Sequence, residues 1–496
     1  MQRIIQADKD CYITNKIVKG VSKISGNTGC AATLDLYKLY GLTFSGTNPN
    51  IEMTRLLIHF PIDTIRDKFD NSEINISDPT FWCKIKLRDV YGGQPTPSNF
   101  NVVLHPLSAS FQEGLGRDVT FYSDRHVSNW LSSSLGVSWH VTGCNGPCYS
   151  TGSGDYITAS SLLVSTECTQ SFVSGEEDLL IDVTSIISAT IAGDIPDQGF
   201  RISFSNTHES DTASYFVKRF GSRSVYDESK RPYLVWGFDD SSVDNTSNFY
   251  VNSTSSLFMY NYENDELKNI ISGTSEISGD NCVLLRMSTP ISGGTLSYYF
   301  TGSQHSHGFR GFCYVTGTYS ARPIITDNTQ IQTLFNVSGT IPFTPVWTSL
   351  DQSVTYMTGT QVRLKRSSKQ SSIETKFDVV TVDMPEIIRR DTDTTRCQVF
   401  FSPKKEFLEI VKVPVQISSA IVNNAFYRIK NDADETVIDF DFDKNSTRLS
   451  SDNKIMYFDL HAGNLPPGRL YTIDIATVSN GIQTRYTNTS QKFRVI

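Results

Sequence analysis

The alternation of apolar and polar residues is the main pattern of this chain, and it predicts β-strands through most of its length. Residues 233–238 put Tyr, Val and Gly on one face of a strand and Leu, Trp and Phe on the other. A strand that is largely apolar on both faces is typical of one buried between two sheets. Pro232 stands at its start, where the missing amide proton costs no ladder hydrogen bond.

Only one short helix is predicted. A strand-like run at 179–183 gives way at Thr184 to alternating Ile, Ser, Ala and Thr residues, and Gly193 follows. Because Thr is a favourable N-cap and Gly a common C-terminal stop, we expect a helix between them that covers the open end of a sandwich. Residues 320–383 show no helical period.

Turn-rich segments divide the chain. With 496 residues, it is too long for a single core of ordinary size. The polar stretch 239–248 predicts a linker, and beyond it short apolar runs at 257–260, 283–287, 296–300 and 309–315 are separated by Gly, Ser and Asn. The predicted fold class is all-β, with several β-sandwich domains of jelly-roll and immunoglobulin-like type in series. Their expected bounds are 1–238, 249–383 and 384–496.

The last of these domains carries a local motif. Residues 465–471 read Leu-Pro-Pro-Gly-Arg-Leu-Tyr, in which Leu465, Gly468 and Tyr471 have the spacing of a tyrosine corner. A Tyr at the start of a strand after a Pro-Gly turn can return its hydroxyl to the crossover backbone. The motif resembles that of fibronectin type III and immunoglobulin-like domains, which implies a spacer or a docking unit.

A second resemblance covers about residues 8–238. Residues 215–236 contain Arg219, Arg223 and Pro232 in an arrangement that resembles the closing hairpin of a DNRLRE-type β-sandwich. Residues 55–63, 180–184 and 199–204 resemble other strands of that family in the expected order. The resemblance implies a binding and display module rather than an enzyme.

A third resemblance lies within about residues 384–480. The segments that carry it are 424–430, 440–442, 448–452, 457–459 and 467–471. They are similar to structural proteins of T-even-like marine tailed phages. This implies a component of the neck, tail, baseplate or head surface of a virion.

Charge singles out one surface segment. The chain has 44 Lys and Arg against 52 Asp and Glu, a net charge of −8, so nucleic-acid binding is not favoured. Four cations nevertheless gather at the end of a hairpin-like strand, and they are Arg363, Lys365, Arg366 and Lys369. They predict either a docking patch, for an acidic partner or a phosphate backbone, or a solvated loop.

The cysteines and histidines of the chain are its candidate disulfide and metal sites. Nine cysteines exclude a complete disulfide framework, and the pair Cys144 and Cys148 is predicted to be reduced rather than to form a disulfide or, with His140, part of a zinc site. His305 and His307 would need further ligands to hold a metal. We therefore expect no metal and no cofactor.

Aspartates crowd residues 432–443, where Ile438, Phe440 and Phe442 alternate with carboxylates. This alternation predicts a strand with one apolar face. Carboxylates in a line along a strand do not converge as calcium requires, so a calcium site is not expected.

The sequence lacks the local patterns of known catalytic centres, including phosphate-binding loops and zinc-protease or nucleophile motifs. It also lacks an apolar stretch of about 20 residues and a signal-peptide core near Met1. We expect a protein made in the host cytoplasm, located in the virion, without a membrane or nucleic-acid partner.

Two functions follow as hypotheses. The first is a non-enzymatic virion structural protein that packs against other virion proteins and forms a symmetric homo-oligomer. The alternative is a carbohydrate-binding module protein, with a host-surface glycan as the ligand. Its candidate aromatic platform consists of Tyr122, Trp130, Trp139 and Tyr156.

Overall fold

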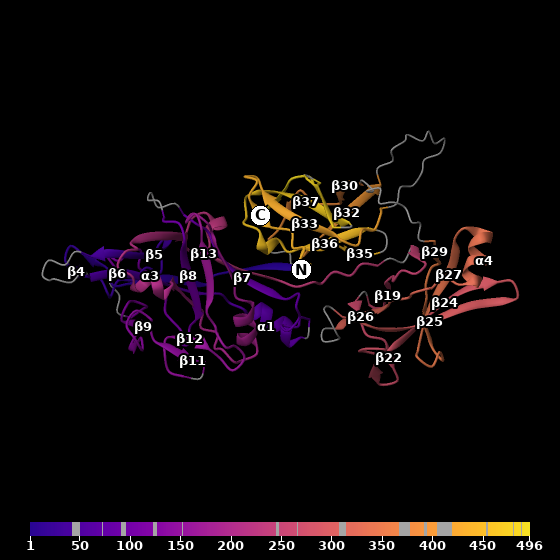
Figure 1. Cartoon of the computed structure of the whole chain (residues 1–496), viewed down its shortest axis with the longest axis horizontal. Helices are drawn as coiled ribbons and strands as arrows, with labels where there is room; N and C mark the ends of the chain where they lie inside the picture. The colour runs from indigo at the N-terminus through magenta and orange to yellow at the C-terminus, as the bar shows by residue number, and fades with distance from the viewer. Residues whose placement is uncertain are drawn as a thin grey trace. The chain divides into compact units, whose positions relative to one another are not determined.

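The computed structural model describes residues 1–41, 50–71, 73–90, 96–122, 126–150, 152–244, 248–264, 266–306, 314–366, 377–390, 394–403, 419–452, 455–479, 481–487 and 489–496 (Figure 1). Its regular secondary structure is predominantly β-strand, in several sheets, which confirms the predicted all-β class. The chain forms two compact units. One comprises Arg3–Asp67 and Phe81–Gly237, and the other comprises Met1–Gln2, Lys68–Thr80 and Phe238–Ile496.

The first unit contains two large antiparallel sheets. The four-stranded sheet has the order β1 (Gln2–Gln6), β17 (Tyr233–Gly237), β7 (Trp82–Leu87), β14 (Leu179–Asp182). The seven-stranded sheet has the order β13 (Cys168–Phe172), β8 (Phe100–Pro106), β15 (Phe200–Phe204), β6 (Asn50–His59), β5 (Thr33–Gly41), β16 (Phe216–Gly221), and β2 (Lys9–Thr14) also pairs with β6. Short pairs are formed by β3 (Ile17–Val18) with β4 (Val21–Ser22), β9 (Ser132–Ser134) with β10 (Val137–Ser138), and β11 (Pro147–Tyr149) with β12 (Tyr156–Ala159).

Aromatic side chains fill the core of this unit. Phe100 of β8 stacks on Phe172 of β13 with ring centroids 4.7 Å apart, and Trp236 of β17 is fully buried. Four of the five residues of β17 are buried and Tyr233 is half-buried. This confirms the prediction that β17 is apolar on both faces.

The predicted helix is present as α2 (Thr184–Ile191). Gly193 follows it with a φ of +83°, a conformation that suits glycine. The expected N-cap is wrong, because Val183 occupies that position and Thr184 is the first helical residue. The Thr184 hydroxyl instead accepts a hydrogen bond from the backbone N–H of Cys83 in β7, at 2.9 Å, which ties α2 to the sheet. The other short helices of this region are α1 (Asp63–Asp70), α3 (Asn206–Ser210) and η1 (Glu228–Lys230).

In the second unit, one curved eight-stranded sheet covers a core of its own. Its order is β18 (Asn248–Tyr250), β29 (Val362–Lys365), β27 (Ile341–Thr348), β24 (Val283–Ile291), β25 (Gly294–Ser306), β26 (Tyr314–Ala321), β19 (Leu257–Tyr260), and β28 (Thr355–Thr358) also pairs with β27. Val283, Leu285 and Met287 of β24 point into the core, and the residues between them face outward.

The sequence showed no helical period in residues 320–383. The structure has a helix there, α4 (Thr329–Ser338), so this prediction is wrong. The side chain of Asn328 caps it by accepting from the Ile331 N–H at 2.9 Å, and Ile331 and Phe335 are its buried residues. A stripe of two buried residues over ten is too narrow to show a period. The cap residue and Gly339 at the helix end were the local signals available.

The C-terminal part is a sandwich of two sheets around a second core. One sheet has the order β30 (Phe377–Val382), β32 (Thr395–Pro403), β36 (Met456–Leu460), β35 (Ser450–Ser451). The other has the order β31 (Ile387–Ile388), β39 (Phe493–Val495), β37 (Leu470–Ser479), β33 (Ala425–Asn431), β34 (Thr436–Ile438), with β38 (Ile482–Tyr486) on β37. Tyr427 and Phe458 stack across this core at 4.1 Å, and η2 (Ala462–Asn464) precedes β37.

The strand predicted through Phe440 and Phe442 is wrong. β34 ends at Ile438, and the Asp441 carboxylate accepts from the backbone N–H groups of Lys444 and Ser446 at 2.9 and 3.1 Å. A short acidic side chain that binds nearby backbone amides competes with a sheet ladder and closes a turn. The two Phe rings therefore stack on each other outside a strand, 5.5 Å apart.

Candidate functional site

The predicted cationic patch lies on β29 of the eight-stranded sheet. Val362 and Leu364 are buried, so Arg363 and Lys365 point to the opposite, outward face. Arg366 is turned away from them, because it donates to Asn336 Oδ1 at 3.1 Å and its guanidinium lies 5.2 Å from the Phe335 ring of α4. Lys369 lies outside the described residues. The structure thus brings two of the four residues together on one surface.

That surface extends over neighbouring strands. Tyr250 of β18 is paired in parallel register with Lys365, and on β24 the outward-facing Arg286 stands opposite Tyr299 of β25. We call Tyr250, Arg286, Tyr299, Arg363 and Lys365 the outer sheet face. Among the described residues of these eight strands, the only Lys, Arg, Asp or Glu side chains are its three cations.

Arg286 is incompletely satisfied. Its Nε atom is buried and has no hydrogen-bond partner in the described part of the chain. No acidic group among the described residues lies within ion-pair distance of Arg363 or Lys365 either. A rigid sheet that presents cations and Tyr rings without neutralising carboxylates can bind an acidic surface.

The residues that carry the DNRLRE resemblance have internal partners. Arg219 of β16 pairs across the ladder with Asp35 of β5, at 2.9 Å between Nε and Oδ1. Arg223 pairs with Glu113 at 2.9 Å. The carbonyl of Pro232 accepts from the Ala7 N–H at 3.2 Å. These three residues hold the first unit together.

Arg223 also organises a buried carboxyl group. The Arg223 backbone N–H donates to Asp10 Oδ2 at 2.6 Å, and the Asp10 N–H donates to Glu113 Oε2 at 3.0 Å. Burial raises the pKa of Asp10 to about 7, and nearby Glu113 adds to this effect, whereas the Arg223 N–H opposes it. A proton is therefore held at this point near neutral pH.

Four buried cations bind loop carbonyls and so brace loops of the first unit. The sequence did not predict this role. Lys38 of β5 donates to the carbonyls of His208 and Asp211, at 2.6 and 2.5 Å. Lys218 of β16 pairs with Asp89 and donates to the carbonyls of Gly175 and Glu177, at 2.8 and 2.9 Å. The available signal was a Lys set among Leu, Tyr, Phe and Val residues in the middle of each of two strands.

Arg55 and Arg201 brace one long loop. Arg55 pairs with Glu209 at 2.8 Å and donates to the Gly143 carbonyl at 2.7 Å. Arg201 donates to the Cys144 carbonyl at 2.8 Å and lies 4.5 Å from the Tyr156 ring. Since these guanidinium groups bind backbone carbonyls, they fix loop shape and are not directed toward a substrate.

The braced loop contains the two cysteines predicted to be reduced. Cys144 is buried, Cys148 is half-buried, and both are free thiols in the structure. The Asp155 carboxylate accepts from the N–H groups of His140, Val141 and Gly146, at 2.6 to 2.9 Å, and so closes the loop. The part of the chain that the structure describes contains no group of three His, Cys, Asp or Glu placed to hold a metal ion.

The candidate aromatic residues do not form one platform. Trp139 belongs to the core, and its indole donates to the Asn129 carbonyl at 2.8 Å. Trp130 and Tyr156 are covered by Arg55 and Arg201, whereas Tyr122 is exposed. His305 contacts the Phe258 ring at 5.0 Å, and His307 lies outside the described residues.

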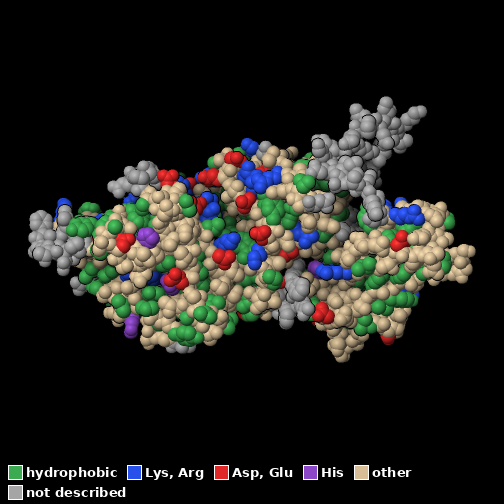
Figure 2. Space-filling view, in the orientation of Figure 1, with side chains coloured by type: hydrophobic (Ala, Val, Ile, Leu, Met, Phe, Trp, Pro, Cys, Tyr) green, Lys and Arg blue, Asp and Glu red, His purple; other side chains and the backbone are tan. Residues whose placement is uncertain are grey.

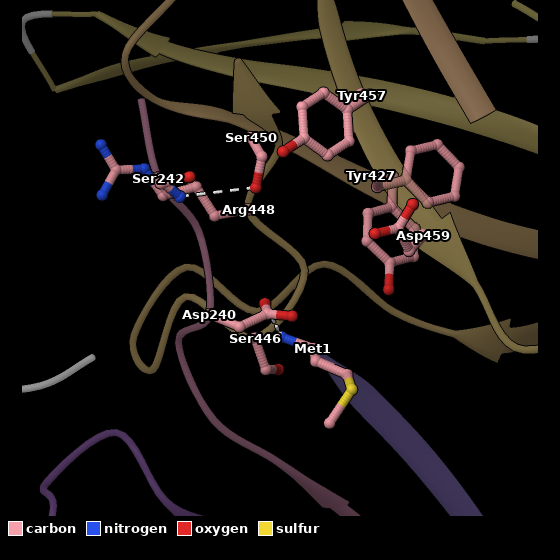
Figure 3. Close-up of a pocket in the computed structure, with 10 residues that line it drawn as sticks. Met1, Asp240, Ser242, Tyr427, Ser446, Arg448, Ser450, Tyr457 and Asp459 are labelled. Carbon is pink, nitrogen blue, oxygen red and sulfur yellow. Dashed lines mark hydrogen bonds and ion pairs between the residues drawn. The ribbon is translucent and has the colours of Figure 1, made fainter. Parts of the chain in front are cut away.

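A small polar cleft of about 90 Å³ lies in the second unit (Figure 3). Its charged groups are paired within the protein: the amino group of Met1 with Asp240, Asp459 with Arg396 at 2.9 Å, and Arg448 with the Asn423 carbonyl at 2.9 and 2.7 Å. Burial, with the nearby charge of Asp240, raises the pKa of Tyr427 above its ordinary value. Because these charged groups already have partners, they offer little to a charged ligand.

Comparisons with known proteins give no family. No protein-family model and no curated protein matches the chain. Similar solved structures include the D00–D0 domain of intimin, with 10% identity over 52% of this chain and 96% of that one, at a TM-score of 0.13. The BSP domain of a biofilm-associated protein has 6% identity over 100% and 89%, at 0.16, and the chicken CNTN1 FN1–FN3 domains have 10% over 64% and 81%, at 0.14. At these TM-scores the likeness carries no argument. No helix of the described chain has the length and apolar character to cross a bilayer.

Proposed function

We propose that the chain is a non-enzymatic structural component of a tailed-phage virion that acts by packing against other virion proteins. The observation that carries this proposal is the location of the Lys and Arg side chains. Lys38, Arg55, Arg201 and Lys218 are buried and bound to loop carbonyls. Arg363 and Lys365, in contrast, lie on the outward face of a sheet and form no ion pair within the described residues. Braced loops and a surface of one charge sign suit contact with an acidic partner protein.

The test is incorporation into particles. Virions purified through a density gradient should contain the chain at a fixed ratio to the major head protein, measured by quantitative mass spectrometry. Replacing Arg363 and Lys365 by Ser should reduce this ratio. The matched control is Arg322→Ser, since Arg322 is also exposed but directly follows β26 and does not lie on a strand that contributes to the outer sheet face.

A protein found only free of particles would overturn the proposal. The glycan-binding alternative is tested on the same preparation by a binding screen against host-surface polysaccharides. Saturable binding together with absence from particles would replace a structural role with a recognition role.

A further inference from the structure

Acidic side chains gather in two hairpins that are separate from the eight-stranded sheet. Two hairpins, β20 (Tyr262–Glu263) with β21 (Glu266–Leu267) and β22 (Ile271–Ser272) with β23 (Ser275–Glu276), follow β19. We call the segment 262–280 the acidic hairpins. Their described acidic residues, all exposed, are Glu263, Glu266, Glu276 and Asp280. Lys268 is the single cation of the segment and pairs with Glu263 at 3.5 Å.

The acidic hairpins are bound to strands toward one end of the eight-stranded sheet, and β29 lies toward the other end of the strand order. The hairpins are attached to β25 and β26, because Asn261 N–H donates to the Gly317 carbonyl at 2.8 Å and Gln304 Nε2 donates to Asn269 Oδ1 at 2.9 Å. β29 lies four strands from β26 in the sheet order, about 19 Å along the sheet. Figure 2 shows Lys and Arg side chains in the region of β29, with an acidic group beside them, and acidic side chains near β22.

Each surface also offers apolar area. Tyr250 and Tyr299 of the outer sheet face are 45% and 50% exposed, and Tyr262 and Ile271 of the acidic hairpins are 63% and 64% exposed. Tyr is among the residues that are enriched at protein interfaces. The two surfaces are therefore complementary in charge and similar in character.

We propose that the outer sheet face of one copy binds the acidic hairpins of a second copy, head to tail. This inference rests on the proposed structural function and names the partner of the same surface. A second copy fits because three cations that have no ion-pair partner among the described residues meet four carboxylates that have one Lys among them. With a net charge of −8, the rest of each copy repels its neighbours, so attraction is confined to this pair of surfaces.

A contact between two different surfaces repeats from copy to copy. It closes into a ring when the rotation between copies fits and otherwise extends as a filament. A two-fold contact, in contrast, would use the same surface on both copies and stop at a dimer.

The experiment uses the full chain in sedimentation velocity. We expect wild-type protein to assemble beyond a dimer in 50 mM salt, and its association to weaken by about tenfold or more in 500 mM salt, because charge attraction is screened. The face-neutral variant is Arg363→Ser with Lys365→Ser. The hairpin-neutral variant is Glu263→Gln with Glu266→Gln.

Each variant alone should be monomeric, since one half of every contact is missing. An equimolar mixture should form a 1:1 dimer, because only one intact pair of surfaces remains. Arg322→Ser should assemble like the wild type, and circular dichroism checks that both variants are folded.

Wild-type protein that stays monomeric, variants that assemble normally, or a mixture that stays monomeric would each overturn the inference. These outcomes are separate from the proposed function. If the chain does not self-associate but enters particles at a fixed ratio, this inference fails and the proposed virion role stands. If the chain self-associates but is absent from particles, the proposed virion role fails.

Discussion

The hydroxyl of Tyr471 donates a 2.5 Å hydrogen bond to the carbonyl of Pro466, five residues earlier in the chain. The Tyr471 side chain is fully buried, and its ring lies 5.6 Å from that of Phe493 in β39. Gly468, with a φ of +82°, makes the intervening turn and donates its N–H to the Val495 carbonyl at 2.8 Å. The corner thus joins the start of β37 to the last strand of the sandwich.

Tyr471→Phe should destabilise the C-terminal sandwich by about 1–3 kcal/mol, because it leaves the Pro466 carbonyl without its partner in a buried site. The measurement is native-state hydrogen exchange of β37 amides in the full chain. Tyr486→Phe is the control, since its hydroxyl has no hydrogen bond within the described residues. Equal protection in the two variants would show that the corner bond contributes nothing.

Lys218→Met should cost the first unit about 3–5 kcal/mol, because it leaves Asp89 and two loop carbonyls without their buried cation. Guanidinium-chloride unfolding followed by Trp fluorescence reports mainly on this unit, which holds four of the five Trp residues. Lys84→Met, at a half-buried position of β7, should change stability by less than about 1 kcal/mol. A Lys218 effect no larger than that of Lys84 would contradict the bracing role.

The first unit should lose stability as the pH rises from about 4 to about 7. Because burial raises the pKa of Asp10 to about 7, the folded state keeps a proton that the unfolded chain has already lost over this range. The loss should amount to a few kcal/mol and level off above pH 7. Unfolding at pH 5 and pH 8 measures it.

Asp10→Asn keeps an acceptor for the Arg223 N–H but cannot titrate, so it should flatten this pH dependence. Asp67→Asn changes an exposed carboxyl group and should leave the profile unchanged. If the Asp10 variant retains the full wild-type slope, another group is responsible.

The buried thiols should resist alkylation in the folded protein. Burial raises the pKa of Cys144 to about 12, so it carries almost no thiolate at neutral pH, and solvent does not reach it. Cys148 is half-buried and should react faster under iodoacetamide. Mass spectrometry of labelled peptides compares the two sites, and a disulfide between them would appear as a pair that reacts only after reduction.

Local patterns in the sequence determined much of the fold. The apolar positions of β17 and β24, the helix before Gly193 and the hydroxyl contact of Tyr471 depend on residues within a few positions of each other, so their spacing was sufficient. The turn at Asp441 was also local, but its side-chain hydrogen bonds overrode an alternation that looked like a strand.

Only the tertiary structure determined which residues form the outer sheet face. Sheet register places Tyr250 beside Lys365 and Arg286 opposite Tyr299, and no local spacing relates Tyr250 to a residue more than a hundred positions away. The same holds for Lys218, whose partners come from loops that the fold brings to one buried point. A charged residue shows in the sequence that it needs a partner, but only the packed chain determines whether that partner is a loop carbonyl, a neighbouring carboxylate or another molecule.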